Sequence, residues 1–239
     1  MDAREVIRNS RAGTFAVVYI PNLSTETLES PVDLLSAPAL GAHGSAVAIG
    51  VDRFITCSHV IEPFLNTRGS LLLAAAPRQG PPEIVYLVNK VVGDANLDLA
   101  LMSASPKLGE AVPLGLDTRI PEMGLEVVCL GVPFAEKEGS VGEREVNVKI
   151  SLPLRAVKGI VSSSVHENGR LEVDVQLNPG MSGGPVLSLE SGLVTGICEG
   201  FGYVRGDDVT YTASLSQVLA AFAISRRLEE LEARLASGS

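Results

Sequence analysis

Short apolar runs separated by turn residues fill most of this chain of 239 residues. Two of the runs, residues 146–151 and 171–177, alternate strictly between apolar and polar side chains. An alternation of period two gives a strand one buried and one solvent-facing side, which is typical of antiparallel sheets. The pattern therefore predicts an all-β chain, with Asn168-Gly169 as a hairpin turn. Strands are predicted over residues 15–20, 45–50, 53–57, 71–75, 84–92, 99–103, 126–132, 145–152, 156–165, 170–177, 184–189, 193–199 and 209–213.

A segment rich in proline and glycine separates these runs into two sets. Residues 106–124 hold three of the 14 prolines and three of the 24 glycines, and such a composition indicates a linker. We therefore divide the chain into a first β unit at 1–105, this linker, a second β unit at 125–213, and a C-terminal helix with its tail at 214–239. The length is ample for a buried core.

The C-terminal helix is the only one of useful length that the sequence predicts. Ser214 is its candidate N-cap, and the apolar side chains that would share one face are Leu215, Val218, Leu219 and Phe222. The residues that follow are mostly charged, with a thin stripe of leucines. The simple interpretation is a solvated helix packed on the second unit, and the alternative is a segment that binds a partner.

Charge and cysteine content exclude several classes of function. The formal net charge is −9, which disfavours nucleic acid and anionic membranes as partners.

The longest apolar runs fall far below the ~18 residues of a membrane span, and the first is too short for the core of a signal peptide. Cys57, Cys129 and Cys198 show no metal-like or disulfide spacing, so we expect no metal, no cofactor and a cytoplasmic location.

The residues around Ser182 point most clearly to chemistry. Residues 178–185 read Asn-Pro-Gly-Met-Ser-Gly-Gly-Pro, and glycines beside a serine permit a tight turn with a close substrate approach. An ordinary glycine-rich turn is the alternative. The segment also fits the nucleophile elbow of α/β-hydrolases, but those enzymes place their histidine after the serine. Here His43, His59 and His166 all precede Ser182, so an order of His, Asp, Ser remains.

Two further residues could complete such a site. His59 directly follows a short apolar strand that ends in small residues, which would place it at the mouth of the first unit. Asp98 is enclosed by apolar residues and needs a partner if it is buried, and an imidazole N–H is one such partner. The alternatives are a solvated histidine and an acid at a strand edge.

Taken together, these segments resemble the chymotrypsin-like serine proteases, and most closely the HtrA/Deg branch. The resemblance covers nearly the whole chain, although no PDZ domain follows. The segments that carry it are residues 44–50, 56–60, 98–101, 128–134, 159–162, 178–185 and 194–197.

The resemblance implies two antiparallel six-stranded β-barrels with an active site in the cleft between them, followed by the C-terminal helix. It makes His59, Asp98 and Ser182 the catalytic triad, and the backbone N–H groups of Gly180 and Ser182 the oxyanion hole. The residues that it suggests for substrate binding are Gln176, Leu177, Thr195, Gly196 and Ile197.

Three departures from the relatives refine this expectation. Val60 stands where many secreted proteases have a disulfide cysteine, which indicates a reducing compartment. Met181 replaces the Asp of zymogens that pairs with a new N-terminus, so activation by cleavage is not expected. Gln176 replaces the acid of trypsin-like specificity pockets, so we expect cleavage after Val, Ala or Leu, while Glu199 leaves a basic residue open.

The implied function is a serine endopeptidase that cleaves protein or peptide substrates through a covalent acyl-enzyme. The alternative is a non-catalytic protein-binding module on the same fold, although no triad residue is lost. Met181 is unusual and no PDZ domain follows, which leaves three alternatives for the control of activity: a regulatory protein partner, a homo-oligomer, or no regulation at all.

Overall fold

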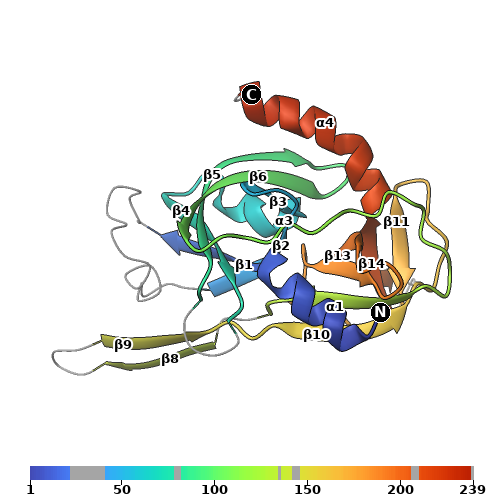
Figure 1. Ribbon diagram of the computed structural model, residues 1–239, viewed down its shortest axis with the longest axis horizontal. Coiled ribbons are helices and arrows are strands. Elements are labelled where there is room, and N and C mark those ends of the chain that lie inside the picture. The colour runs from blue at the N-terminus through green and yellow to red at the C-terminus, as the bar shows by residue number, and fades with distance from the viewer. Residues whose placement is uncertain (22–40, 78–81, 134–135, 142–145, 206–209, 238–239) are drawn as a thin grey trace.

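The computed structural model describes residues 1–21, 41–77, 82–133, 136–141, 146–205 and 210–237 (Figure 1). Its first unit is a closed barrel with the strand order β1-β2-β3-β6-β5-β4, in which every neighbouring pair is antiparallel. The strands are β1 (Thr14–Pro21), β2 (Gly41–Ala48), β3 (Arg53–Cys57), β4 (Gly69–Ala75), β5 (Val85–Asp94) and β6 (Leu99–Leu108). The prediction of a six-stranded first barrel is confirmed.

The second unit has six antiparallel strands but is not a closed barrel. Its strand order is β10-β7-β12-β13-β14-β11. The strands are β7 (Glu126–Gly131), β10 (Arg155–Ile160), β11 (Arg170–Val173), β12 (Pro185–Ser188), β13 (Val194–Arg205) and β14 (Thr210–Ala220).

The expectation of a second closed barrel is therefore wrong. The two edges of the second sheet meet at one isolated bridge, between Val161 and Val173, beside a hydrogen bond from the Asp174 N–H to the Ile160 carbonyl of 2.9 Å. The predicted strand over 170–177 ends at Val173, because the chain then leaves the sheet toward the loop of Ser182. Too little of this edge strand remains to form a continuous ladder with β10.

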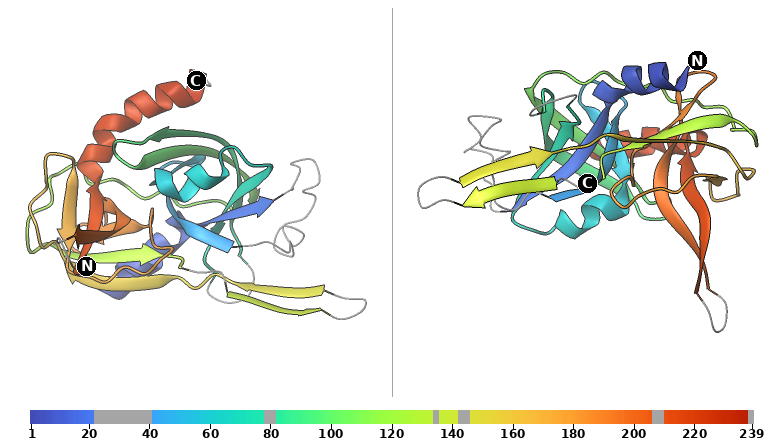
Figure 2. Two further views of the ribbon diagram at one scale, coloured as in Figure 1. Left: turned by 180° about the vertical axis from the view of Figure 1, so that it is seen from behind. Right: turned by 90° about the horizontal axis from the view of Figure 1, so that it is seen from below.

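Several elements lie outside the two main sheets. Two strands that form a separate pair, β8 (Glu136–Val141) and β9 (Val146–Ser151), extend away from the body of the molecule (Figures 1 and 2). The N-terminus forms α1 (Ala3–Ser10) and the short helix η1 (Arg11–Gly13). After β3 the chain forms α3 (Ser58–Ile61) and η3 (Glu62–Phe64). The sequence pattern does not predict α1, α3 or β8.

The C-terminal helix, α4, covers Ala221–Ser237 and does not begin at Ser214 as predicted. Residues up to Ala220 belong to β14. Val218 and Leu219 are both fully buried, in different core clusters, so both faces of this strand are covered. A strand that is apolar on both faces mimics helical periodicity, which explains the early start that the sequence suggested. None of the helices in the described part of the chain is long and apolar enough to cross a membrane.

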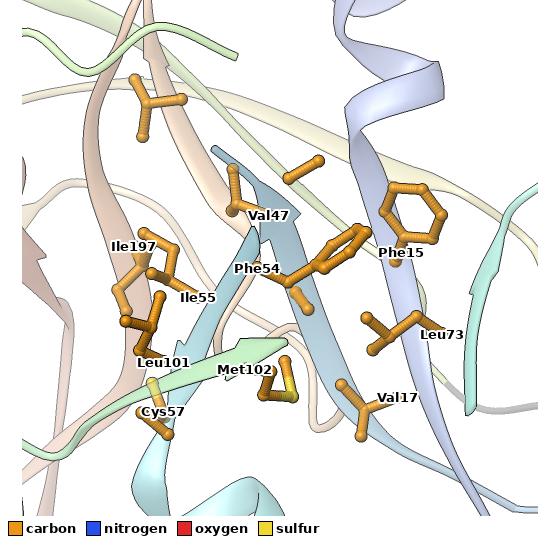
Figure 3. Close-up of a cluster of buried hydrophobic side chains, with 14 of the residues drawn as sticks. Phe15, Val17, Val47, Phe54, Ile55, Cys57, Leu73, Leu101, Met102 and Ile197 are labelled. Carbon is orange, nitrogen blue, oxygen red and sulfur yellow. The ribbon is translucent and has the colours of Figure 1, made fainter. Parts of the chain in front are cut away.

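The main hydrophobic core joins the two units. In the first barrel Phe15, Phe54 and Tyr86 meet edge to face, with ring centroids 4.9 to 6.0 Å apart. Figure 3 shows Ile197 of β13 beside Ile55 and Leu101 of the first barrel, and all three are fully buried in one cluster. Because the two sheets share a packed core, the elements that carry His59 and Ser182 are held together directly.

Candidate active site

His59 and Asp98 come from the ends of neighbouring strands. His59 lies in α3, immediately after β3, and Asp98 precedes β6. The two strands pair in the register Cys57 to Leu99, which brings the two loops together. Nδ1 of His59 lies 2.6 Å from Oδ2 of Asp98, and the His59 backbone N–H donates to Oδ1 at 2.9 Å. The carboxylate therefore fixes both the ring and the backbone of the histidine.

This pair shifts the pKa of the imidazole and selects the tautomer of its neutral form. The hydrogen bond to Asp98 is the main cause that raises the pKa of His59; burial opposes it, and Glu199 and Glu62 add to the rise. A carboxylate can only accept from Nδ1, so the neutral ring keeps its lone pair on Nε2. The side chain is 48% exposed, so this nitrogen can be reached by a substrate. His59 is therefore arranged as a general base.

Asp98 has an unusual backbone conformation. Its φ is +52°, and it is the only residue other than glycine with a positive φ in the described part of the chain. Aspartate tolerates this region better than most residues, but the conformation still costs about 1–3 kcal/mol. The Ser58 N–H donates to the Asp98 carbonyl at 3.0 Å and holds it from one side. Such a conformation persists only where the surroundings fix it.

The loop of Ser182 is held against β2. Asn178 to Met181 form a turn closed by a hydrogen bond of 3.0 Å, with Gly180 in its third position at φ +90°. This is the arrangement of a type II turn, which requires a glycine there. Ser45 of β2 donates its hydroxyl to the Gly180 carbonyl at 2.8 Å and its N–H to the Ser182 carbonyl at 2.7 Å. A residue of the first barrel thus positions the loop of the second unit.

Gly183 shows why the serine needs small neighbours. Its φ is +83°, and a Cβ atom there would clash with the Ser45 carbonyl and the Thr56 side chain. Its N–H donates to the Cys198 carbonyl at 2.7 Å. No residue but glycine fits this position without displacing β2 and β3.

The hydroxyl of Ser182 donates to the Glu199 carbonyl at 2.9 Å, and no hydrogen bond joins it to His59. In the described part of the chain, the backbone N–H groups of Gly180 and Ser182 have no protein acceptor. Two N–H groups beside a serine are the donors that an oxyanion requires. Rotation about χ1 of Ser182 would release the hydroxyl from Glu199.

Glu199 forms a buried ion pair that the sequence pattern does not indicate. Arg170 donates Nε to one Glu199 oxygen at 2.8 Å and Nη2 to the other at 2.7 Å, and the exposed fractions of the two side chains are 18% and 7%. Burial raises the pKa of Glu199, and Arg170 partly opposes this. A buried acid requires a partner, but nothing in the sequence indicates which of the 19 basic residues supplies it.

The residues suggested for substrate binding are scattered. Gln176 is exposed, whereas Leu177, Thr195, Gly196 and Ile197 are buried. Ile197 belongs to the core between the two units. Thr195 lines a surface cavity with Asp117 and Ser188, and that cavity is not lined by His59, Asp98 or Ser182. The other two histidines, His43 and His166, are exposed.

One cluster near the site has the residue types of a metal centre. Ligand atoms of Cys57, His59 and Asp98 lie within 4.8 Å of one another. The Cys57 thiol is fully buried and donates to the Cys198 carbonyl at 3.2 Å, and burial raises its pKa well above the ordinary value. Zinc binds the thiolate, which this environment disfavours, and Asp98 already holds Nδ1 of the ring. The cluster therefore fits a metal poorly.

Replacement of Arg170 by alanine is expected to destabilise the protein by about 3–5 kcal/mol, because Glu199 would be left buried without its partner. Ionised Glu199 is the costly form, so the loss should shrink as the pH falls below the folded-state pKa of Glu199 and the group becomes neutral. Urea unfolding at several pH values measures both effects. Lys158→Ala, which breaks a surface pair with Glu126, is the control and should cost below about 1 kcal/mol. Equal losses in both variants would contradict the prediction.

The chain matches known peptidases in sequence. The family model for the trypsin-like peptidase domain matches residues 44–197. The serine protease Do-like HtrA of Lactobacillus helveticus is 27% identical over 193 residues, which cover 76% of this chain and 45% of the relative. The magnetosome formation protease MamE of Paramagnetospirillum magneticum is 26% identical over 155 residues, which cover 64% of this chain and 19% of the relative.

This chain thus spans less than half the length of either relative. The segment that the family model matches covers more than half of this chain. It includes the paired His59 and Asp98 and the Ser182 loop. The chain therefore belongs to the family of trypsin-like peptidase domains.

Proposed function

We propose that this chain is a serine endopeptidase that hydrolyses peptide bonds through His59, Asp98 and Ser182. The observation that carries the proposal is the hydrogen bond of 2.6 Å between His59 Nδ1 and Asp98, which leaves Nε2 free to accept a proton. Family membership and the two protease relatives support the same chemistry.

The mechanism begins with rotation of the Ser182 hydroxyl away from the Glu199 carbonyl. Oγ attacks the scissile carbonyl carbon while His59 Nε2 takes the hydroxyl proton. The π electron pair of the carbonyl moves onto its oxygen, which becomes the oxyanion. The N–H groups of Gly180 and Ser182 stabilise that oxyanion, each by roughly 3–4 kcal/mol. The tetrahedral intermediate collapses, the C–N bond breaks, and the leaving amine takes the proton from His59. Water then attacks the acyl-enzyme and gives a proton to His59. The ester bond to Ser182 breaks, His59 returns the proton to Oγ, and the carboxylic acid product leaves.

Asp98 does not take part in proton transfer. It holds the imidazole in the tautomer that leaves Nε2 unprotonated and stabilises the imidazolium that forms. The same hydrogen bond that orients the ring raises the pKa of His59. The proposed activity therefore requires a pH above the pKa of His59.

We also propose that the substrates are proteins with a neutral rather than basic residue before the cleaved bond. Glu199 already has both oxygens on Arg170, so it does not offer a free carboxylate to a lysine or arginine. The three cysteines are free and buried, which supports our proposal of a reducing, cytoplasmic environment. Control by a protein partner or by self-association stays a prediction from the sequence.

Active-site labelling tests the proposed nucleophile directly. A fluorophosphonate probe should modify the folded protein at Ser182, because the probe requires a serine activated by a base and an oxyanion site. The label is located by mass spectrometry of tryptic peptides. Ser182→Ala should not be labelled.

Ser162→Ala is the matched control, since the Ser162 hydroxyl is buried and has no hydrogen-bond partner in the described structure. It should retain full labelling. Absence of label on the folded wild type, or equal labelling of Ser182→Ala, would overturn the assignment of Ser182.

A further inference from the structure

The strained conformation of Asp98 raises the question of what holds it. Asp98 ends a five-residue turn that begins at Asp94, the last residue of β5. Oδ1 of Asp94 accepts the backbone N–H groups of Asn96 at 3.0 Å and Leu97 at 3.3 Å. The Asp98 N–H in turn donates to the Ala95 carbonyl at 3.4 Å. The Asp94 carboxylate therefore stabilises the turn that ends at Asp98.

The second oxygen of Asp94 is held by the C-terminal helix. Arg227 of α4 donates Nε to Oδ2 of Asp94 at 2.5 Å, and the Asp94 side chain is only 5% exposed. Burial alone would raise the pKa of Asp94, but the hydrogen bonds from Arg227, Leu97 and Asn96 outweigh it and hold the pKa below the ordinary value. Arg234 of the same helix donates to the Gly93 carbonyl at 3.1 Å.

The helix itself is firmly attached to the first barrel. Ile224, Leu231 and Leu235 are buried in the main core, which the first barrel shares with the second sheet. Arg53 of β3 pairs with Glu232 at 3.1 Å. Figures 1 and 2 show α4 leaving the second sheet at the end of β14 and running over β5 and β6. An element that begins in the second unit thus reaches the turn of the catalytic acid.

We propose that Arg227 is a positioning residue for the triad: through Asp94 it fixes the turn that presents Asp98 to His59. The inference rests on the proposed function, because it assigns α4 a role in that same site. Arg227 touches no reacting atom. Its effect passes from Asp94 to the backbone of Asn96 and Leu97, then to Asp98 and the imidazole.

Kinetics of Arg227→Met test this link, since methionine keeps an apolar stem and removes the charge and the donor. A small displacement of a catalytic group costs up to about a hundredfold in rate, so we expect kcat to fall roughly 10- to 100-fold with KM unchanged. Without Arg227, the hydrogen bond between Asp98 and His59 should be weaker, so the pKa of His59 should be lower than in the wild type. The acid limb of the pH profile should therefore move to lower pH. The other acids that act on His59, Glu199 and Glu62, are not altered.

The matched control is Glu232→Gln, which removes the charge from the Arg53 pair on the same helix; in the described part of the chain Glu232 makes no hydrogen bond or ion pair with the turn. It should keep kcat within about twofold. The double variant Arg227→Met/Asp94→Asn should be no slower than the slower single variant, because both act on one link. Should Arg227→Met fail to fold, Asp94→Asn alone carries the test, since its amide retains an oxygen for the turn.

A proton NMR spectrum supplies a readout that does not depend on turnover. The Nδ1 proton of His59, between imidazole and carboxylate, should give a low-field resonance in the wild type and in Glu232→Gln, and a broadened or missing one in Arg227→Met. If the wild type hydrolyses no peptide bond, the proposed function fails. The resonance still tests whether Arg227 positions Asp98 against His59. Unchanged kcat, pH limb and resonance in folded Arg227→Met or Asp94→Asn would overturn the inference.

Discussion

Replacement of Ser182 by alanine is expected to lower peptide-bond hydrolysis by about 10⁶-fold, which is the scale found when a triad nucleophile is removed. The variant has no oxygen to form the acyl-enzyme, so only binding and the oxyanion site remain. Because the lost hydroxyl donates only to the Glu199 carbonyl, the fold should persist. The measurement is initial-rate kinetics on an unfolded protein substrate, together with a proteome-wide cleavage profile that compares the variant with the wild type.

The same profile tests the proposed specificity. Cleavage sites that disappear in Ser182→Ala should carry a neutral residue before the cut, and a majority of lysine or arginine there would contradict our assignment of Glu199. Ser162→Ala again serves as the control that leaves the site intact. A Ser182→Ala protein that still cleaves substrates at the wild-type rate would refute the proposed function altogether.

Replacement of Asp98 by asparagine is expected to lower kcat by about 10⁴-fold, because an amide favours the wrong imidazole tautomer. The hydrogen bond to Asp98 is the main cause of the raised pKa of His59, so the variant should have a lower His59 pKa. In the proposed mechanism neutral His59 is the base, and this form prevails above that pKa. The acid limb of the residual activity should therefore lie at lower pH than in the wild type, which a pH–rate profile measures.

Asp52→Asn is the control for this prediction, because Asp52 is an exposed acid of the same barrel that pairs with Arg53. It should leave both kcat and the acid limb unchanged. The double variant Ser182→Ala/Asp98→Asn should be no less active than Ser182→Ala alone, since members of a triad act as one unit. Additive losses would show that Asp98 and Ser182 act separately.

Much of the site follows from the sequence because local pattern and chain order specify it. The apolar strand before His59 and the apolar residues around Asp98 predict that each lies at the end of a strand, and the structure adds the pairing of β3 with β6 that brings them together. The glycines around Ser182 predict a tight turn, and the structure places Gly180 at a positive φ. These features depend on neighbours in the chain, which a sequence displays.

What the sequence could not supply are the pairings between distant residues. Arg170 lies 29 residues before Glu199, and Arg227 lies 133 residues after Asp94, so only the folded chain identifies them as partners. The start of α4 was misplaced because β14 is buried on both faces. Whether the second sheet closes into a barrel depends on where β11 ends. The strand ends at Val173, but the strict alternation of residues 171–177 predicts that it continues.

The core shared by the two units has a mechanical consequence. Ile197 of the second sheet is packed among side chains of the first barrel, so the two halves of the site cannot swing apart without exposing apolar surface to water. A site whose two halves are fixed in this way does not open to admit a folded domain. If the chain cleaves proteins as proposed, its targets must themselves supply the flexibility, as an extended segment that is already unfolded or can be peeled away from its own structure.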